Sequence, residues 1–197
     1  DGENVVAVAC YEYSSASWLE DQDFWRLHGL FRSVELAARP HVHIENTQIE
    51  ADWDPEAGTA SLDAALTVLN AADAATVRAT LKDADGNTVW QTTGDAEAQT
   101  AISSEPLQGI EPWSAESPTL YELDVDVIDQ AGDVIECTSQ KVGFRRFRIE
   151  DGILTINGKR IVFKGADRHE FDAERGRAVT EQDMIDDVVF CKRHNIN

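Results

Sequence analysis

Residues 19–32 read Leu-Glu-Asp-Gln-Asp-Phe-Trp-Arg-Leu-His-Gly-Leu-Phe-Arg, a run that mixes carboxylates, an amide, guanidinium groups and aromatic rings. The run is too polar for a core strand and too aromatic for an ordinary loop. Aromatic faces beside carboxylates suit a carbohydrate, because its C–H face stacks on rings while acids and amides bind its hydroxyls. An arginine–aspartate cluster at the junction of two domains would use the same residue types. Both interpretations remain open at this point.

A second candidate is the ionisable cluster at residues 164–172, Lys-Gly-Ala-Asp-Arg-His-Glu-Phe-Asp. It follows a predicted strand, and enzymes built on α/β barrels place their catalytic residues at the C-terminal ends of strands. His169, between Arg168 and Glu170, could donate a hydrogen bond to a substrate hydroxyl or act as a general acid or base. A structural hydrogen bond is the simpler alternative. A metal site is a weak third, because the sequence has no His-Glu-x-x-His spacing.

Two further clusters favour structural roles. Residues 143–148, Gly-Phe-Arg-Arg-Phe-Arg, could contact a carboxylate or a sugar. A strand whose arginines pair with the acidic surface is the favoured interpretation of this run. Residues 111–121 place Trp113 between two prolines, which predicts a rigid, packed loop between strands.

These clusters must be positioned by a mainly β chain. From residue 41 to about residue 148, short β-branched and apolar runs alternate with turn signals such as Asp85-Gly86-Asn87. Strands are predicted at residues 42–51, 59–70, 75–82, 88–93, 100–104, 121–128 and 134–142. Short strands at this spacing, without a convincing helix between them, indicate an immunoglobulin-like β-sandwich.

The segment before the sandwich is also predicted to be β. Residues 5–13 and 30–37 alternate loosely in hydrophobicity, which favours a strand at each. Pro40 then marks a boundary, because proline cannot donate to a sheet ladder.

The pattern changes after residue 148. Asn157-Gly158 predicts a type I′ hairpin turn between arms at residues 152–156 and 159–164. One apolar face predicts a helix at residues 181–194, with Thr180 as its N-cap and Asp183 in its first turn.

Composition excludes several functional classes. The 197 residues carry a net charge of −20 at pH 7, which disfavours nucleic-acid binding, since a polyanion requires Lys and Arg. No secretory signal and no apolar run of about 18 residues appears, so the sequence predicts neither export nor membrane insertion. Cys10, Cys137 and Cys191 lie far apart without metal-ligand spacing, which suits free thiols in a reducing cytoplasm.

Together these segments resemble the bacterial β-galactosidases of glycoside hydrolase family 2. The resemblance covers nearly the whole chain, with its motifs in the family's order and spacing. These motifs are Glu20-Asp21-Gln22-Asp23-Phe24-Trp25-Arg26, Gly29-Leu30-Phe31-Arg32, Trp113-Ser114-Ala115-Glu116-Ser117-Pro118-Thr119-Leu120-Tyr121, Val142-Gly143-Phe144-Arg145, Asn157-Gly158-Lys159 and Arg168-His169-Glu170. The related β-glucuronidases and β-mannosidases share the sandwich, but the Asp-Gln-Asp-aromatic-Trp-Arg run resembles the galactosidase branch.

The resemblance implies three modules, two of them partial. Residues 1–38 would be the C-terminal part of a sugar-binding jelly-roll domain, and residues 39–147 an immunoglobulin-like β-sandwich domain. Residues 148–197 would be the truncated start of a (β/α)8 or TIM barrel, with its hairpin, first strand and first helix. We then expect residues 4–37 and 152–197 to pack on each other or on a second copy, or to be less ordered than the sandwich.

The resemblance also implies site residues. Asp23 matches the family's acidic residue that reaches the galactose and helps to hold a sodium ion near its 6-hydroxyl. His169 matches a histidine that lines the galactose site and helps to stabilise the transition state. Trp25, Arg26 and Arg32 are expected to hold the jelly-roll edge against its neighbours.

The activity is expected to belong to a longer protein. Retaining hydrolysis needs two carboxylates about 5 Å apart, and the family's acid/base and nucleophile glutamates would lie beyond Asn197. The resemblance therefore implies an inactive internal part of a cytoplasmic, oligomeric β-galactosidase that uses Mg²⁺ and Na⁺. Asp167 stands where many relatives have asparagine. The alternatives are a non-catalytic β-sandwich for domain packing or carbohydrate binding, or another family 2 glycosidase such as a β-glucuronidase or β-mannosidase.

Overall fold

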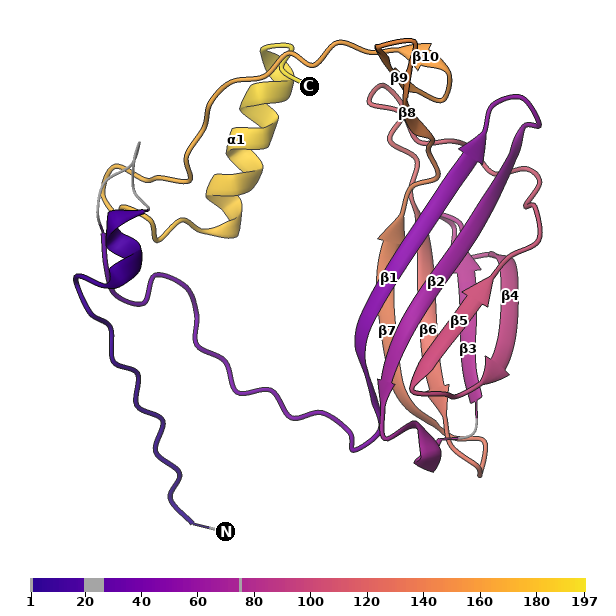
Figure 1. Ribbon diagram of the computed structural model, residues 1–197, viewed down its shortest axis with the longest axis horizontal. Helices are drawn as coiled ribbons and strands as arrows, with labels where there is room; N and C mark the ends of the chain where they lie inside the picture. The colour runs from indigo at the N-terminus through magenta and orange to yellow at the C-terminus, as the bar shows by residue number, and fades with distance from the viewer. Residues whose placement is uncertain (1, 20–26, 75) are drawn as a thin grey trace. The chain divides into compact units, whose positions relative to one another are not determined.

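The computed structural model describes residues 2–19, 27–74 and 76–197, which form two compact units (Figure 1). The sandwich unit comprises residues 38–162. The flanking unit combines the described residues of 1–37 with residues 163–197. The expectation that the two flanks pack on each other is therefore confirmed for these ranges, whereas residues 152–162 belong to the sandwich unit.

The strands of the sandwich occupy the ranges that the sequence predicts, with ends that differ by a few residues. They are β1 His43–Asp54, β2 Thr59–Leu69, β3 Thr76–Lys82, β4 Thr88–Asp95, β5 Gln99–Ser103, β6 Tyr121–Ile128 and β7 Val134–Val142. A short 3-10 helix, η2 (Ala71–Asp73), joins β2 to β3.

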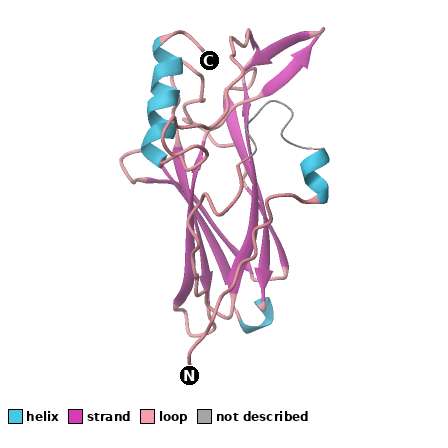
Figure 2. Ribbon diagram, turned by 90° about the vertical axis from the view of Figure 1, so that its left-hand side faces the viewer, coloured by secondary structure: helices cyan, strands magenta, loops and turns pink. Residues whose placement is uncertain are grey.

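Two antiparallel sheets face each other in this unit (Figures 1 and 2). One sheet has the order β1-β2-β5 and the other the order β4-β3-β6-β7. The pairs β2–β5 and β3–β6 join strands that are not neighbours in the chain. The predicted immunoglobulin-like sandwich is therefore confirmed.

The core of the sandwich is made by alternate residues of its strands. Buried and exposed positions alternate along β2 and β6, as a strand requires when one of its faces is covered. Phe144, just after β7, is fully buried and lies edge-on to Tyr121, with 5.5 Å between the ring centroids. The other large, fully buried side chains include Leu62, Leu66, Leu81 and Leu123.

A small antiparallel sheet follows the sandwich and belongs to the same unit. It contains β8 Phe147–Glu150, β9 Ile153–Ile156 and β10 Lys159–Arg160, in the order β10-β9-β8. Asn157 and Gly158 have φ values of 51° and 73°, so the predicted type I′ turn has the two positive φ angles it needs. The second arm of the hairpin ends at Arg160 instead of residue 164. β8 overlaps the strand favoured for residues 143–148 only at residues 147 and 148. The backbone groups of residues 144–146 bind Trp113, Ala51 and Asn157 instead of forming a ladder with a neighbouring strand.

The flanking unit contains helix α1 (Glu181–Arg193) and a short 3-10 helix, η1 (Ser15–Trp18). The predicted helix is confirmed and ends one residue earlier than expected. Thr180 Oγ1 accepts a hydrogen bond from the Asp183 amide over 3.2 Å, and the Asp183 carboxylate accepts one from the Thr180 amide over 2.7 Å. This reciprocal capping satisfies backbone donors that the first helical turn leaves unpaired.

The strands predicted at residues 5–13 and 30–37 are wrong. Every residue of both ranges is described, and none belongs to a strand. A strand forms only where its backbone N–H and C=O groups pair with a neighbouring strand. The described part of the flanking unit provides no such neighbour, so loose alternation in the sequence is not sufficient there.

The sandwich core predicts a large stability difference between two leucines of β2. Leu66 is fully buried, and Leu66→Ala should lower the free energy of unfolding by about 3 kcal/mol, within the range of about 2–5 kcal/mol for such cavities. Leu69→Ala is the matched control, because Leu69 is 41% exposed on the same strand. Urea denaturation followed by circular dichroism measures both. Equal losses would contradict the core assignment.

Candidate functional site

The candidate site lies in the flanking unit, where an open hollow of about 280 Å³ joins the two chemically richest segments of the sequence. Its lining residues are Phe31, Arg32, His169, Glu170 and Arg177. His169 is exposed in this hollow, as a substrate-binding residue must be. Asp23, Trp25 and Arg26 lie outside the described residues, so their predicted roles stay predictions.

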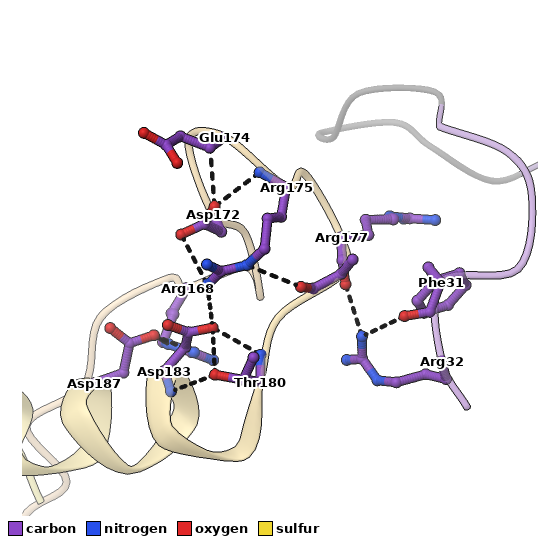
Figure 3. A network of polar contacts seen from close by, with 11 residues as sticks. Phe31, Arg32, Arg168, Asp172, Glu174, Arg175, Arg177, Thr180, Asp183 and Asp187 are labelled. Atoms are coloured by element: carbon purple, nitrogen blue, oxygen red, sulfur yellow. Dashed lines mark hydrogen bonds and ion pairs between the residues drawn. The ribbon is translucent and has the colours of Figure 1, made fainter.

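Arg32 connects the two segments through both terminal nitrogens of its guanidinium group. Its Nη2 lies 2.8 Å from Glu170 Oε2. Its Nη1 donates to the carbonyl oxygen of Arg177 over 2.7 Å (Figure 3). Arg32 therefore contacts a neighbouring segment as expected, whereas its place at a jelly-roll edge stays a prediction. The two side chains of the ion pair are 43% and 45% exposed, so the pair contributes only about 0–1 kcal/mol to stability. Its main effect is to fix the positions of its partners.

The residue before His169 is anchored in a different direction. Arg168 Nε donates to Asp187 Oδ2 over 2.9 Å, and Arg168 Nη2 contacts the same oxygen (Figure 3). The hydrogen bond to Asp187 raises the pKa of Arg168, so its guanidinium group remains charged. Asp187 belongs to α1, and the helix therefore holds the backbone on the N-terminal side of His169.

The loop between Glu170 and α1 is closed by a compact turn. Asp172 and Gly176 exchange two backbone hydrogen bonds of 2.8 Å, and Asp172 Oδ1 accepts from the amides of Glu174 and Arg175. Arg175 Nη2 lies 2.6 Å from Asp183 Oδ2 and 3.2 Å from Asp172 Oδ2 (Figure 3). This arginine therefore ties the turn to the first turn of α1.

Asp183 is the most strongly perturbed carboxyl of this network. Hydrogen bonds from the backbone and side chain of Thr180, followed by the one from Arg175, lower its pKa from 3.8 to about 2. Each of these donors stabilises the ionised form of the carboxyl. The helix start is therefore organised around a carboxylate.

Protonation of Asp183 should weaken the start of α1. Because the pKa is lower in the folded state, the stabilisation is complete above pH 4 and is lost as the pH falls through about 2. Carboxyl-detected NMR should give a titration midpoint near 2 for Asp183. Asp183→Asn should lack this acid-dependent change in helix content by circular dichroism. A midpoint near 4 would contradict the capping geometry.

The arginine-rich run 143–148 makes contacts within the sandwich unit, but the strand favoured above is wrong for residues 143–146. Only Phe147 and Arg148 belong to a strand, β8. Arg146 pairs with Asp52 and Asp54 of β1, and the hydrogen bond that it donates to the Asp52 carboxylate is the main cause that raises the pKa of Arg146. The guanidinium carbon of Arg145 lies 4.8 Å from the centroid of the Trp113 ring. The alternative of sugar contacts by this run has no support, because these side chains are used within the sandwich unit.

The loop around Trp113 is packed as predicted. The Trp113 amide donates to the Phe144 carbonyl over 2.8 Å, and Asn157 Nδ2 donates to the Trp113 carbonyl over 3.1 Å. The Tyr121 hydroxyl accepts from the Glu111 amide over 2.9 Å. Gly143 lies close to this loop, and a Cβ there would lie 3.0 Å from the Trp113 side chain, which would have to shift by a few tenths of an ångström.

A metal site around His169 finds no support in the part of the chain that the structure describes. Among those residues, no three His, Cys, Asp or Glu side chains gather in a way that could hold an ion. Asp23, the sodium ligand implied by the resemblance, lies outside them.

Arg177 is the lining residue that sequence reasoning missed. It contributes its backbone carbonyl to Arg32, and a backbone acceptor leaves no signature in residue type. The sequence places Glu170 beside His169 but gives no sign of its partner Arg32, which lies 138 positions away.

Comparison with known protein families shows to which family the chain belongs. The model described as "Glycosyl hydrolases family 2" matches residues 42–145. The TIM barrel domain of the same family matches residues 147–197, and its sugar binding domain matches residues 1–40. The chain belongs to family 2 of the glycosyl hydrolases.

Individual relatives agree with this assignment. "Beta-galactosidase BgaC" of Bifidobacterium adolescentis is 63% identical over 100% of this chain and 19% of its own length. A β-galactosidase of Streptococcus thermophilus is 47% identical over the same shares. The solved apo structure of Bacteroides uniformis β-glucuronidase 3 has a TM-score of 0.78 and 30% identity, covering 89% of this chain and 22% of that one. The chain thus spans about a fifth of the length of these proteins.

None of the helices among the described residues is long and apolar enough to cross a membrane.

Proposed function

We propose that the whole protein is a retaining β-galactosidase that hydrolyses terminal β-D-galactosides such as lactose. The observation that carries this proposal is the identity to β-galactosidases over the whole chain, 63% and 47% for the two relatives named above. The Bacteroides uniformis β-glucuronidase 3 shares the fold at only 30% identity. The galactosidase branch is therefore favoured over the glucuronidase and mannosidase branches.

The described residues would contribute to substrate binding. His169 is exposed in a hollow beside Phe31, where an imidazole N–H can donate to a sugar hydroxyl and an aromatic face can stack on the ring. We assign His169 to galactoside binding and transition-state stabilisation. Asp23 is assigned to the galactose and to a sodium ion.

The reaction itself requires two catalytic carboxyl groups, and we assign neither role to an acid among the described residues. A retaining mechanism uses one carboxyl as acid/base and another as nucleophile, and both are proposed to lie elsewhere in the whole protein. Na⁺ and Mg²⁺ are proposed for the whole enzyme, where they would orient and polarise bound oxygen atoms. The flanking modules are proposed to be the end of a jelly-roll domain and the start of a TIM barrel.

The proposed setting is the cytoplasm, with assembly into a homo-oligomer and without nucleic-acid or membrane partners. Cys10, Cys137 and Cys191 are free thiols, which suits a reducing compartment. Partial desolvation, followed by the hydrogen bond and negative charge of Asp126, raises the pKa of the exposed Cys137 to about 11, so this thiol stays protonated at neutral pH. The charge of −20 supports the absence of a nucleic-acid partner.

Substrate preference tests the galactosidase assignment. The whole protein should hydrolyse nitrophenyl β-galactoside with a kcat/KM at least about a hundredfold above those for the β-glucuronide and the β-mannoside, since unpaired buried polar groups penalise wrong sugars. Preference for either of the latter two would overturn the assignment.

The 197-residue chain alone should behave as a non-catalytic module. It should show no turnover of nitrophenyl β-galactoside, because the carboxylate pair is proposed to lie elsewhere in the whole protein. Calorimetric titration with galactose or lactose should show no saturation. The whole protein under identical conditions is the control. Turnover by the chain alone would contradict the proposal that both catalytic carboxyl groups lie elsewhere in the whole protein. Saturable binding would favour a carbohydrate-binding module.

A further inference from the structure

The two residues that flank His169 are each held by a partner from another segment. Arg168 is bound to Asp187 of α1, and Glu170 is bound to Arg32. The backbone at His169 is therefore restrained on both sides.

We propose that Arg32 is a positioning residue for His169 in the glycosidase reaction. This inference rests on the proposed function, in which His169 contacts the galactoside. Arg32 acts through Glu170 and through the Arg177 carbonyl. It fixes the loop 170–177, which begins directly after His169, and thereby positions the imidazole at the edge of the hollow.

The geometry of Arg32 suits this role better than a single charge would. One terminal nitrogen reaches Glu170 Oε2 at 2.8 Å, and the other reaches the Arg177 carbonyl at 2.7 Å. These two acceptors lie at opposite ends of the loop 170–177, which the Asp172–Gly176 turn closes. A planar, rigid guanidinium group can hold both acceptors at once, whereas a lysine ammonium on a flexible stem holds a single point.

Because the contact between Arg32 and Glu170 is exposed, its effect on the position of His169 can be measured separately from its effect on stability. The side chains of Arg32 and Glu170 are 43% and 45% exposed, so their loss should change the melting temperature little. A catalytic group displaced by about 1 Å, in contrast, can cost about a hundredfold in rate. The expected signature is a loss of kcat without a matching loss of stability.

The test uses the whole enzyme with nitrophenyl β-galactoside. Arg32→Ala and Glu170→Gln should each lower kcat about tenfold to a hundredfold, with KM changed less than about twofold, since the lost interaction acts in the transition state. The double variant should be no worse than the poorer single variant, because the two residues act through one contact. Arg32→Lys should fall between wild type and Arg32→Ala.

The matched control is Arg78→Ala. Arg78 is likewise ion-paired with a carboxylate, Asp126, through a contact of 2.6 Å, and it lies in the sandwich unit. Its removal should leave kcat within about twofold of wild type. Melting temperatures of all variants verify folding, and the near-isosteric Glu170→Gln decides the matter if Arg32→Ala fails to fold.

The outcomes distinguish this inference from the function on which it rests. Absence of galactosidase activity in the wild type would overturn the proposed function. Wild-type activity with loss in His169→Ala, but with normal kcat in Arg32→Ala and Glu170→Gln, would overturn the positioning role alone. A loss in Arg32→Ala without a loss in Glu170→Gln would also overturn it, because the effect would not pass through Glu170.

Discussion

The sandwich unit depends on excluding water from one face of each of its two sheets. Alternate side chains of β2 and β6 meet in a single buried layer, and Phe144 fills the space beside Tyr121. Burial of apolar surface is the main favourable term for such a fold. The strand register follows from it, because a shift of one residue would turn every buried leucine or valine towards solvent. The polar contacts of Arg146 and Asn157 then attach the small sheet to this core.

The flanking unit is organised by different forces. Among its described residues Val179 is the one buried hydrophobic side chain, and many apolar side chains of α1 are exposed. Ion pairs and backbone hydrogen bonds instead define the path of residues 163–180. Such exposed contacts contribute little free energy individually, but they select one geometry among many for a polar loop. Such a defined geometry is what the binding role proposed for His169 requires.

The fold of the sandwich unit alone does not define the substrate. A β-glucuronidase shares the architecture at 30% identity, so the sandwich serves enzymes that act on different sugars. Under the proposed function, selectivity comes from side chains such as His169 and Asp23 and not from the sandwich. The resemblance to galactosidases is carried in part by the sequence of residues 20–26.

The sequence by itself determined the features that depend on local backbone chemistry. Asn157-Gly158 specified its turn, Thr180 and Asp183 specified the helix start, and alternation specified the seven strands of the sandwich. It did not determine strands at residues 5–13 and 30–37, because a strand needs a partner that alternation cannot supply. The sequence shows the motif Arg168-His169-Glu170, but it does not show which residues hold this motif in place.

Only the tertiary structure decided which distant groups meet. Arg32 and Glu170 are 138 positions apart, and Arg146 and Asp52 are 94 apart, so no local rule connects them. The Arg177 carbonyl is a backbone group that every residue possesses, and its use as an acceptor is a matter of position alone. The residue types around His169 could thus be read from the chain, whereas their arrangement required the chain to fold, because ion pairing depends on distance in space and not on separation in sequence.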